Sequence, residues 1–253
     1  MRREAWVVAS AYVAANSLLS RASYERVFNA GDVAEPPPGR VSVVVPGWHE
    51  PRRFLEASLS SLKEQTAVWS FPDRFEHVFV GCEGVDLDVP ERYGYRVLCA
   101  PRGKLNARHL GIVNSSGDII VAADSDCLYP PNWLNLVLKP FKEPDVVGVC
   151  TPTWQGWLEP FVGIPKALVF AYKMTGRGSA FRKTAYFEVG GFNLAVNQEN
   201  VRELWLEEEI LFYRRLRSRG RVAYVDAPVI HLGVETSGRG LRPYPRGKRA
   251  YAT

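Results

Sequence analysis

The sequence predicts an α/β fold: a mostly parallel, twisted sheet with helices on both of its faces. Apolar, β-branched runs such as VSVVVP (41–46) are typical of strands that are buried on both faces. Segments with helical spacing of apolar residues alternate with these runs, as in a parallel sheet with crossover helices. With 46% hydrophobic and 23% charged residues, the 253-residue chain can bury a sizeable core, which excludes a disordered chain, a collagen-like repeat and a coiled coil.

The first 40 residues are expected to form an N-terminal helical extension followed by a linker. As a helix, the apolar segment 5–19 would span about 22 Å, less than the roughly 30 Å hydrocarbon core of a membrane. A helix that packs on the domain or lies on a membrane surface is therefore favoured. A spanning helix and a signal peptide are the alternatives, although no clear cleavage site follows the segment. The triple proline 36–38 indicates a stiff linker.

Residues 41–235 carry the alternating elements of the main domain. The predicted strands are 41–46, 77–82, 95–100, 118–124 and 146–151. The predicted helices are 51–65, 104–115 and a third that begins within 130–141. Residues 178–193 then add a short strand and a short helix, 203–220 a long helix, and 221–232 a final strand. Because ligands of such sheets bind outside the carboxyl ends of the strands, the loops after Val45, Cys82 and Ala123 are expected to carry the chemistry.

The positive charge of the chain lies at its C-terminal end. Residues 236–253 hold five Lys or Arg residues and no acid, which accounts for the whole net charge of +5. Since the rest of the chain is neutral, no broad basic face for nucleic acid is expected. The glycines and prolines of this segment predict a basic, flexible tail without a core of its own.

The four cysteines indicate the compartment. None lies in a C-x-x-C pair, and four in a chain of this length predict neither a disulfide scaffold nor a structural zinc site. A reduced, cytoplasmic protein is expected. Peripheral contact with the inner face of a membrane, through segment 5–19 or the basic tail, is the open alternative.

The triplet Asp124-Ser125-Asp126 is the strongest candidate for chemistry. It ends an apolar strand, so both carboxylates are expected at the carboxyl edge of the sheet. Two carboxylates there repel each other unless a cation or a sugar hydroxyl shares them. Such hard oxygen ligands suit Mg²⁺ or Mn²⁺, completed by the phosphates of a bound nucleotide. The simpler interpretation is an acidic turn that binds nothing.

Four segments of the chain together resemble the family 2 glycosyltransferases of the GT-A fold, which is Rossmann-like. They are VSVVVPGWHEPRRFLEASLSSLKEQT (41–66), PRGKLNARHLGIVNSSGDIIVAADSDCLYPPNWL (101–134), GSAFRKTAYFEVGGFN (178–193) and LEEEILFYRRLRSRGRVAYVDAPVIH (206–231). No single segment is decisive. Their order, with the DxD triplet after the fourth strand, makes the match specific over residues 41 to about 232.

The resemblance implies a nucleotide-sugar donor, with UDP or GDP as the nucleotide. The loop after the first strand would line the nucleoside pocket through Pro46, Gly47, Trp48 and Glu50. Lys104 would approach the diphosphate or the base. The second strand of the family normally ends in two aspartates, whereas this one ends in Gly81-Cys82-Glu83-Gly84. Glu83 would accept a hydrogen bond from the base, and the departure leaves the usual preference for uridine open.

A divalent cation, Mn²⁺ or Mg²⁺, follows from the same resemblance. Asp126 would be the principal ligand, Asp124 would bind the metal or the ribose, and Ser125 would lie against the donor. His231, at the end of the final strand, matches a histidine that often completes the metal site of this fold. Without the resemblance, a lone histidine is more often structural.

The implied general base lies on the helix 203–220. The family motif on this helix is a glutamate-aspartate pair, then arginine-leucine six residues after the aspartate, then a glycine five residues after that arginine. When this glycine is set at Gly220, Glu208 falls at the family's glutamate and Glu209 at its aspartate. Glu209 would then remove the proton from the acceptor hydroxyl, and a slip of one residue would give this role to Glu208. Alternatively, these acids only stabilise the amino end of the helix dipole.

The acceptor site implied by the resemblance includes Gly178, Ser179 and Trp154, and its ligand would be a glycan or a lipid-linked acceptor. Trp154 is also plausible as plain core. The family reaction is a single displacement with inversion, in which the acceptor hydroxyl attacks the anomeric carbon. The basic tail would fold over the bound donor, hold the enzyme on an anionic membrane, or only aid solubility.

Two other functions fit parts of the sequence. A non-catalytic nucleotide-sugar or glycan-binding module of the same fold would explain the altered second-strand motif and the glutamate at the base position. A nucleotidyltransferase of related fold would share the metal carboxylates. It needs a glycine-rich, basic triphosphate loop after the first strand, and Gly47-Trp48-His49-Glu50 is not of that kind.

Overall fold

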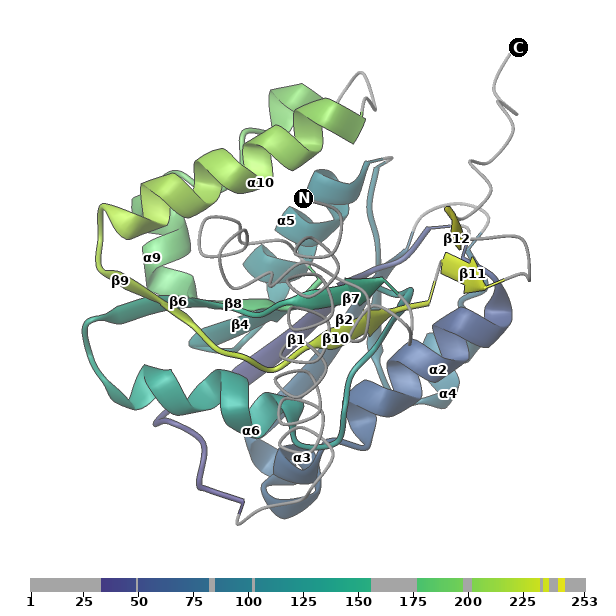
Figure 1. Ribbon diagram of the computed structural model, residues 1–253, viewed down its shortest axis with the longest axis horizontal. Coiled ribbons are helices and arrows are strands. Elements are labelled where there is room, and N and C mark those ends of the chain that lie inside the picture. Colours follow the sequence, from purple (N-terminus) through teal and green to yellow (C-terminus); the bar gives the residue numbers. More distant parts are fainter. Residues whose placement is uncertain are drawn as a thin grey trace, which may run out of the picture.

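The computed structural model describes residues 33–48, 50–81, 85–101, 103–155, 177–197, 202–232, 234–236 and 241–243. Within these residues lies a seven-stranded sheet with the strand order β3-β2-β1-β4-β8-β6-β9 (Figure 1). Its strands are β1 (Val41–Pro46), β2 (Phe75–Gly81), β3 (Arg96–Cys99), β4 (Ile119–Ala122), β6 (Val146–Cys150), β8 (Ser179–Arg182) and β9 (Arg221–Tyr224). Strand β8 runs antiparallel to both of its neighbours and the other pairs are parallel. The prediction of a mostly parallel sheet is confirmed.

Helices cover both faces of this sheet, as the sequence predicted. One face carries α2 (Arg52–Lys63), α3 (Thr66–Ser70), α4 (Asp88–Arg92) and α6 (Trp133–Leu138), and the other carries α5 (Lys104–Asn114), α9 (Lys183–Glu188) and α10 (Arg202–Arg217) (Figure 1). Short 3₁₀ turns follow at η1 (Pro72–Arg74), η2 (Lys139–Lys142) and η3 (Leu194–Asn197).

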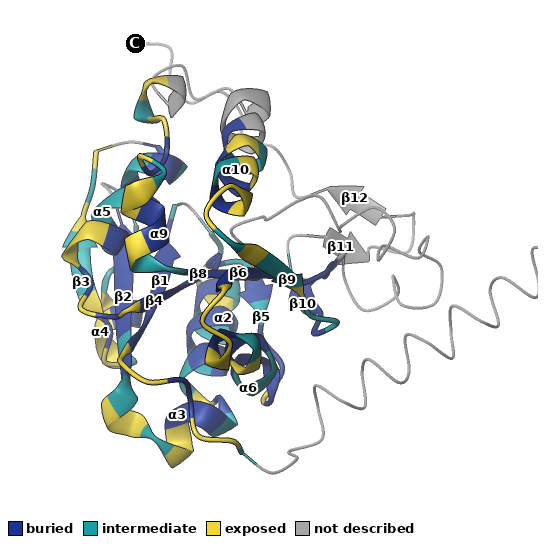
Figure 2. Cartoon of the chain, turned by 90° about the vertical axis from the view of Figure 1, so that its left-hand side faces the viewer, coloured by how far each residue is buried: buried dark blue, intermediate teal, exposed yellow. Residues whose placement is uncertain are grey.

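Strand β1 shows why two helical layers are needed. Val43 and Val45 pack into the core beneath α2 and α6, whereas Val44 packs into the core beneath α5. Every residue of β1 is buried, while β3 and β9 at the two edges are partly exposed (Figure 2). Side chains that alternate along a strand point to opposite faces, so a strand that is apolar throughout requires cover on both.

The prediction of one final strand over 221–232 is wrong. The chain leaves the main sheet after β9, and β10 (Val229–His231) enters a separate three-stranded sheet in the order β5-β10-β7. Its partners are β5 (Cys127–Leu128), which is antiparallel, and β7 (Thr153–Gln155), which is parallel. Pro228 lies at the change of sheet, and a proline has no N–H to continue a ladder of hydrogen bonds.

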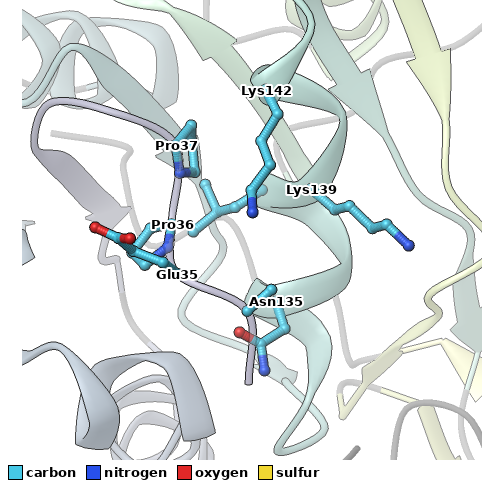
Figure 3. Close-up of a pocket in the computed structure, with 8 residues that line it drawn as sticks. Glu35, Pro36, Pro37, Asn135, Lys139 and Lys142 are labelled. Atoms are coloured by element: carbon cyan, nitrogen blue, oxygen red, sulfur yellow. The ribbon is translucent and has the colours of Figure 1, made fainter. Parts of the chain in front are cut away.

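The described part of the predicted linker packs on the domain. Pro36 and Pro37 are buried, and Arg74 donates hydrogen bonds to the carbonyl oxygens of Pro37 and Gly39 at 2.6 and 2.7 Å. A small pocket beside the two prolines is lined by residues that include Asn135, Lys139 and Lys142 (Figure 3). Pro37, Arg74 and Lys142 precede β1, β2 and β6, so the linker lies at the amino ends of the parallel strands.

Several sequence predictions fall on residues outside the described ranges. These are the helical extension over 1–32, the position of Glu83, and most of the basic tail. Within the tail, β12 (Leu241–Pro243) pairs antiparallel with β11 (Val234–Thr236), where the sequence predicted only a flexible segment. In the described part of the chain, no helix combines the length and the apolar character that crossing a membrane requires.

Helix α5 lies unusually close to the sheet at Gly111. A Cβ atom on this glycine would lie 2.4 Å from Cγ1 of Val44 and 3.0 Å from Cγ2 of Val80. Both valines are fully buried on strands and cannot move aside. The absence of a side chain at Gly111 therefore sets the distance between α5 and the strands beneath it.

We expect Gly111→Ala to lower the free energy of unfolding by about 1–3 kcal/mol, because it overpacks this contact. Helix propensity alone would make the same change stabilising by about 1 kcal/mol, so the sign identifies the cause. Urea denaturation measures it. Val113→Ala, at an exposed position of the same helix, is the control and should change the value by no more than about 0.5 kcal/mol. A stabilised Gly111→Ala variant would contradict the close contact.

Candidate active site

The loops after β1 and β4 meet at the carboxyl edge of the main sheet. Strands β1 and β4 are parallel neighbours, with Val44 paired to Ala122, so their following loops lie side by side. Ser125 Oγ donates a hydrogen bond of 3.0 Å to the carbonyl oxygen of Pro46. The structure thus brings the DxD triplet against the predicted nucleoside loop.

Asp124 is buried among cations. Lys104 Nζ lies 2.8 Å from its Oδ2, Arg108 Nη2 lies 2.6 Å from its Oδ1, and Arg177 Nε lies 3.5 Å from its Oδ2. Burial alone would favour the protonated acid, but the three cations outweigh it and hold the pKa of Asp124 well below its ordinary value. Asp124 is therefore an ionised carboxylate whose charge is already shared.

Arg108 links this carboxylate to the helix of the predicted base. Its Nη1 lies 2.5 Å from Oε1 of Glu209, and the arginine side chain is only 1% exposed. One buried guanidinium thus joins the loop after β4 to α10 across α5. Arg108 requires buried carboxylates on both sides, because an unpaired charge in this position would be strongly destabilising.

Glu208 faces a different part of the domain. Its Oε1 accepts hydrogen bonds from Asn193 N at 2.8 Å and from Arg215 Nη2 at 2.6 Å. Arg215 also donates to the carbonyl oxygen of Gly191 at 2.8 Å. Glu208 thus holds the turn at Gly190-Gly191 that precedes α10, while its neighbour Glu209 is linked to the DxD triplet through Arg108.

The second sheet brings His231 to Asp126. Register between β10 and β5 pairs His231 with Cys127, and His231 Nε2 lies 2.9 Å from Oδ2 of Asp126. Burial would raise the pKa of Asp126, but the hydrogen bond and charge of His231 lower it below its ordinary value. The predicted pair of metal ligands is therefore in direct contact.

Glu50 lies on the same side of the site. Its Oε2 accepts a 2.7 Å hydrogen bond from Trp48 N, which closes the turn after β1. Burial raises the pKa of Glu50 above its ordinary value, and the negative charge of Asp126 raises it further. Gly47 is required at this turn, because a Cβ there would lie 2.0 Å from the ring of Phe79.

The Asp126–His231 pair suits a divalent cation that a ligand completes. A carboxylate oxygen and an imidazole nitrogen are donors that Mn²⁺ accepts, and Mg²⁺ accepts the oxygen most readily. His231 Nδ1 is buried and has no hydrogen-bond partner among the described residues. No group of three or more His, Cys, Asp or Glu residues that could hold a metal occurs in the described part of the chain. The remaining ligands would have to come from a bound substrate or water.

The structure describes the predicted acceptor residues only in part. Ser179 is buried at the start of β8, and the carbonyl oxygen of Gly178 accepts a 2.8 Å hydrogen bond from Thr151 Oγ1. The backbone of Trp154 lies in β7, but its side chain falls outside the described atoms, as does Glu83. The structure does not test the acceptor roles.

Two site residues escaped sequence reasoning. The position of Arg108 could have been noticed, because it falls on the apolar stripe of α5 with Leu105 and Ile112. A charge on a buried stripe needs a buried partner. Arg177 gave none, because its place depends on the antiparallel entry of β8 beside β4. Ser179 pairs with Ala122, so the residue two positions before β8 arrives next to Asp124.

The family follows from a sequence model. The model of glycosyl transferase family 2 matches residues 42–192, which include the loop after β1, the DxD triplet and β8. The chain belongs to this family. The sequence prediction of a family 2 glycosyltransferase of the GT-A fold is thereby confirmed. No curated protein matches the chain.

Solved structures show the same fold in glycosyltransferases. The mannosyltransferase PcManGT from Pyrobaculum calidifontis, in complex with GDP-Man and Mn²⁺, has a TM-score of 0.61 at 21% identity, with 94% of this chain and 69% of that chain covered. GalNAc-T7 with UDP, GalNAc and Mn²⁺ has a TM-score of 0.59 at 15% identity, with 76% of this chain and 44% of that chain covered. At these identities the likeness shows the fold.

We expect Arg108→Leu to lower the free energy of unfolding by about 3–5 kcal/mol, because Glu209 loses its ionic partner and Asp124 loses one of its cations. Urea denaturation at neutral pH measures the loss. Arg221→Gln is the matched control, since Arg221 makes exposed ion pairs with Glu143 and Asp145 at the opposite edge of the sheet and should cost less than about 1 kcal/mol. Equal losses in the two variants would contradict a buried bridge.

The lowered pKa of Asp124 predicts a pH dependence of stability. The ionised carboxylate stabilises the fold fully above its unfolded pKa, about 3.9, and this stabilisation is lost as the pH falls below that value. The difference in unfolding free energy between the wild type and Asp124→Asn should therefore be largest near neutral pH and narrow below about pH 4. Denaturation series at several pH values measure it. A difference that stays constant down to about pH 3 would mean that Asp124 does not carry this charge.

Proposed function

We propose that this glycosyltransferase moves a sugar from a nucleoside-diphosphate sugar to an acceptor hydroxyl, with inversion and with a divalent metal, Mn²⁺ or Mg²⁺. The observation that carries the proposal is the convergence of Asp124, Asp126 and Glu209 at one edge of the sheet. The first and last of these share the guanidinium of Arg108. The nucleotide and Mn²⁺ in the two similar structures support the donor class and the metal.

The donor would lie over the loops after β1 and β4. Trp48 and Glu50 would face its nucleoside, with Pro46 and Gly47 shaping the turn beneath. Lys104, anchored on Asp124, would face the diphosphate. The hydrogen bond from Trp48 N to Glu50 Oε2 holds this carboxyl group beside the nucleoside loop, where it would contact the base or the ribose.

Asp126 and His231 would hold the metal beside the diphosphate. When bound, the cation supplies a positive charge that stabilises the nucleoside diphosphate as it leaves. The residues of the chain set where that charge lies, because the pairing of β10 with β5 places His231 opposite Cys127 and so next to Asp126.

Glu209 would act as the general base. Its carboxylate is linked through Arg108 to Asp124 of the DxD triplet, whereas Glu208 contacts Arg215 and Asn193 N, away from the triplet. This difference favours the register with Glu209 as the base. Glu209 would take the proton of the acceptor hydroxyl as the oxygen attacks the anomeric carbon from the side opposite the leaving diphosphate. Gly178, Ser179 and Trp154 would contribute to the acceptor side, which would take a glycan or a lipid-linked acceptor.

The test compares Asp126→Asn and Glu209→Gln in donor binding and in turnover. We expect Asp126→Asn to lose the Mn²⁺-dependent part of its affinity for UDP or GDP. Glu209→Gln should bind the same nucleotide as the wild type but transfer or hydrolyse sugar at least about 100-fold more slowly, the usual contribution of a general base. Titration calorimetry and release of nucleoside diphosphate from a panel of nucleotide sugars provide the two measurements.

Two further variants make this test selective. Asp145→Asn removes an exposed carboxylate at the opposite edge of the sheet and should change neither measurement. Glu208→Gln separates the two registers, because loss of turnover there with an active Glu209→Gln variant would move the base by one residue. Binding of nucleotide sugar by the wild type with no turnover of any donor would favour the non-catalytic module instead.

A further inference from the structure

Arg177 reaches the DxD triplet from a separate part of the chain. It lies two residues before β8, and because Ser179 pairs with Ala122 at the carboxyl end of β4, its guanidinium arrives beside Asp124. Its side chain is 23% exposed. Asp126 also lies near enough to interact with the charge of Arg177. Arg177 is therefore a partly exposed cation beside the DxD triplet.

The backbone that presents Arg177 is fixed from two sides. Its carbonyl oxygen accepts a 3.0 Å hydrogen bond from the hydroxyl of Tyr129, which in turn accepts one of 2.7 Å from Asp124 N. The next residue, Gly178, bonds to Thr151 through both the backbone N–H and the hydroxyl of the threonine. A Cβ on Gly178 would lie 2.3 Å from Thr151 Oγ1, so a larger residue does not fit beside Thr151. The side chain of Arg177 thus starts from a rigid point.

The guanidinium of Arg177 makes only a weak contact with Asp124. The two oxygens of Asp124 already have Lys104 Nζ at 2.8 Å and Arg108 Nη2 at 2.6 Å. Arg177 Nε approaches the same carboxylate only to 3.5 Å, outside good hydrogen-bond length. No hydrogen bond from the Nη nitrogens of Arg177 to another described residue is found, and Nε makes its closest contact with Asp124. The Nη groups of this partly exposed side chain are therefore the donors that an anion would meet.

The balance of charge indicates what such an anion would be. Lys104, Arg108 and Arg177 match the charges of Asp124, Glu209 and Asp126, so a divalent cation at Asp126 would leave a positive site that attracts an anion. An arginine fork matches two oxygens of one phosphate, a geometry that a lysine does not reproduce. The site around it is the one proposed to hold the diphosphate of the donor.

We propose that Arg177 binds the diphosphate of the donor through its two Nη groups and stabilises the charge that grows on it as the sugar leaves. This inference rests on the proposed function. The glycosidic bond to the diphosphate breaks, the electron pair stays on the phosphate oxygen, and Arg177 donates hydrogen bonds to the phosphate that carries that charge. Lys104 remains bound to Asp124 and complements it from the other side.

The experiment measures binding of UDP and GDP, and of UMP and GMP, to Arg177→Gln and Arg177→Lys by titration calorimetry with and without Mn²⁺. Arg177→Gln should weaken binding of the diphosphate by roughly 10- to 100-fold, the effect of losing charge-assisted hydrogen bonds, and should weaken the monophosphate much less. Arg177→Lys should lie between, because it keeps the charge but not the fork. Arg221→Gln, an exposed arginine at the opposite edge of the sheet, should bind like the wild type.

The outcomes separate this inference from the function on which it rests. If the wild type prefers diphosphate over monophosphate and Arg177→Gln keeps that preference, Arg177 does not bind the diphosphate. Equal weakening of both nucleotides, with Arg177→Lys no better than Arg177→Gln, would assign the residue a structural role and also overturn the inference. A wild type that binds no nucleoside diphosphate, whichever its base, would overturn the proposed function itself.

Discussion

A charged carboxylate can exist inside this protein only because cations surround it. Asp124 is buried, and taking an ion out of water costs several kcal/mol unless opposite charges compensate it. Two segments supply that compensation: α5 provides Lys104 and Arg108, and the residues before β8 provide Arg177. The approach of α5 to the sheet at Gly111, the entry of β8 beside β4 and the direction of α10 are each tied to this centre. The fold and the site therefore share one electrostatic constraint.

The bridge through Arg108 couples the two halves of the proposed reaction. One nitrogen of the guanidinium contacts the donor-side Asp124 and the other contacts Glu209 on the acceptor side. Because both bonds come from one planar, rigid guanidinium, a movement of one carboxylate changes the hydrogen bond that the other accepts. Glu208, one residue away on α10, is excluded from this arrangement by its own arginine, Arg215. Two adjacent glutamates thus acquire different surroundings from a single helical turn.

The sequence predicted the parts of the site that depend on strand ends. Apolar runs locate β1 and β4, so the order of residues alone places the loop at 46–50 and the DxD triplet at one edge of the sheet. His231 was predicted to join them, but the strand pairing that brings it there could not be read from the sequence. The pairing of β10 with β5 rests on a strand of two residues, Cys127–Leu128, which is too short to leave a periodic pattern.

Arg177 marks the limit of such prediction, since its position follows from the reversed direction of β8 and no local pattern reports that direction. The roles of Glu83 and Trp154 stay predictions, because their side chains lie outside the described atoms. The basic tail beyond Thr236 was predicted from composition, which describes a lack of core but gives no pairing partner for β12.

The small sheet has a consequence for how the domain would respond to heat or denaturant. Its strands β5, β10 and β7 pair over only two or three residues, so it is held by few hydrogen bonds compared with the main sheet. Short, weakly paired elements open locally at lower free energy than the core around them. Asp126 adjoins β5 and His231 ends β10. A ligand bound by both residues would therefore raise the free energy of local opening of this sheet more than that of the main sheet. Slowed amide hydrogen exchange in β10, ahead of any change in β1 or β4, would be the signature of an occupied site.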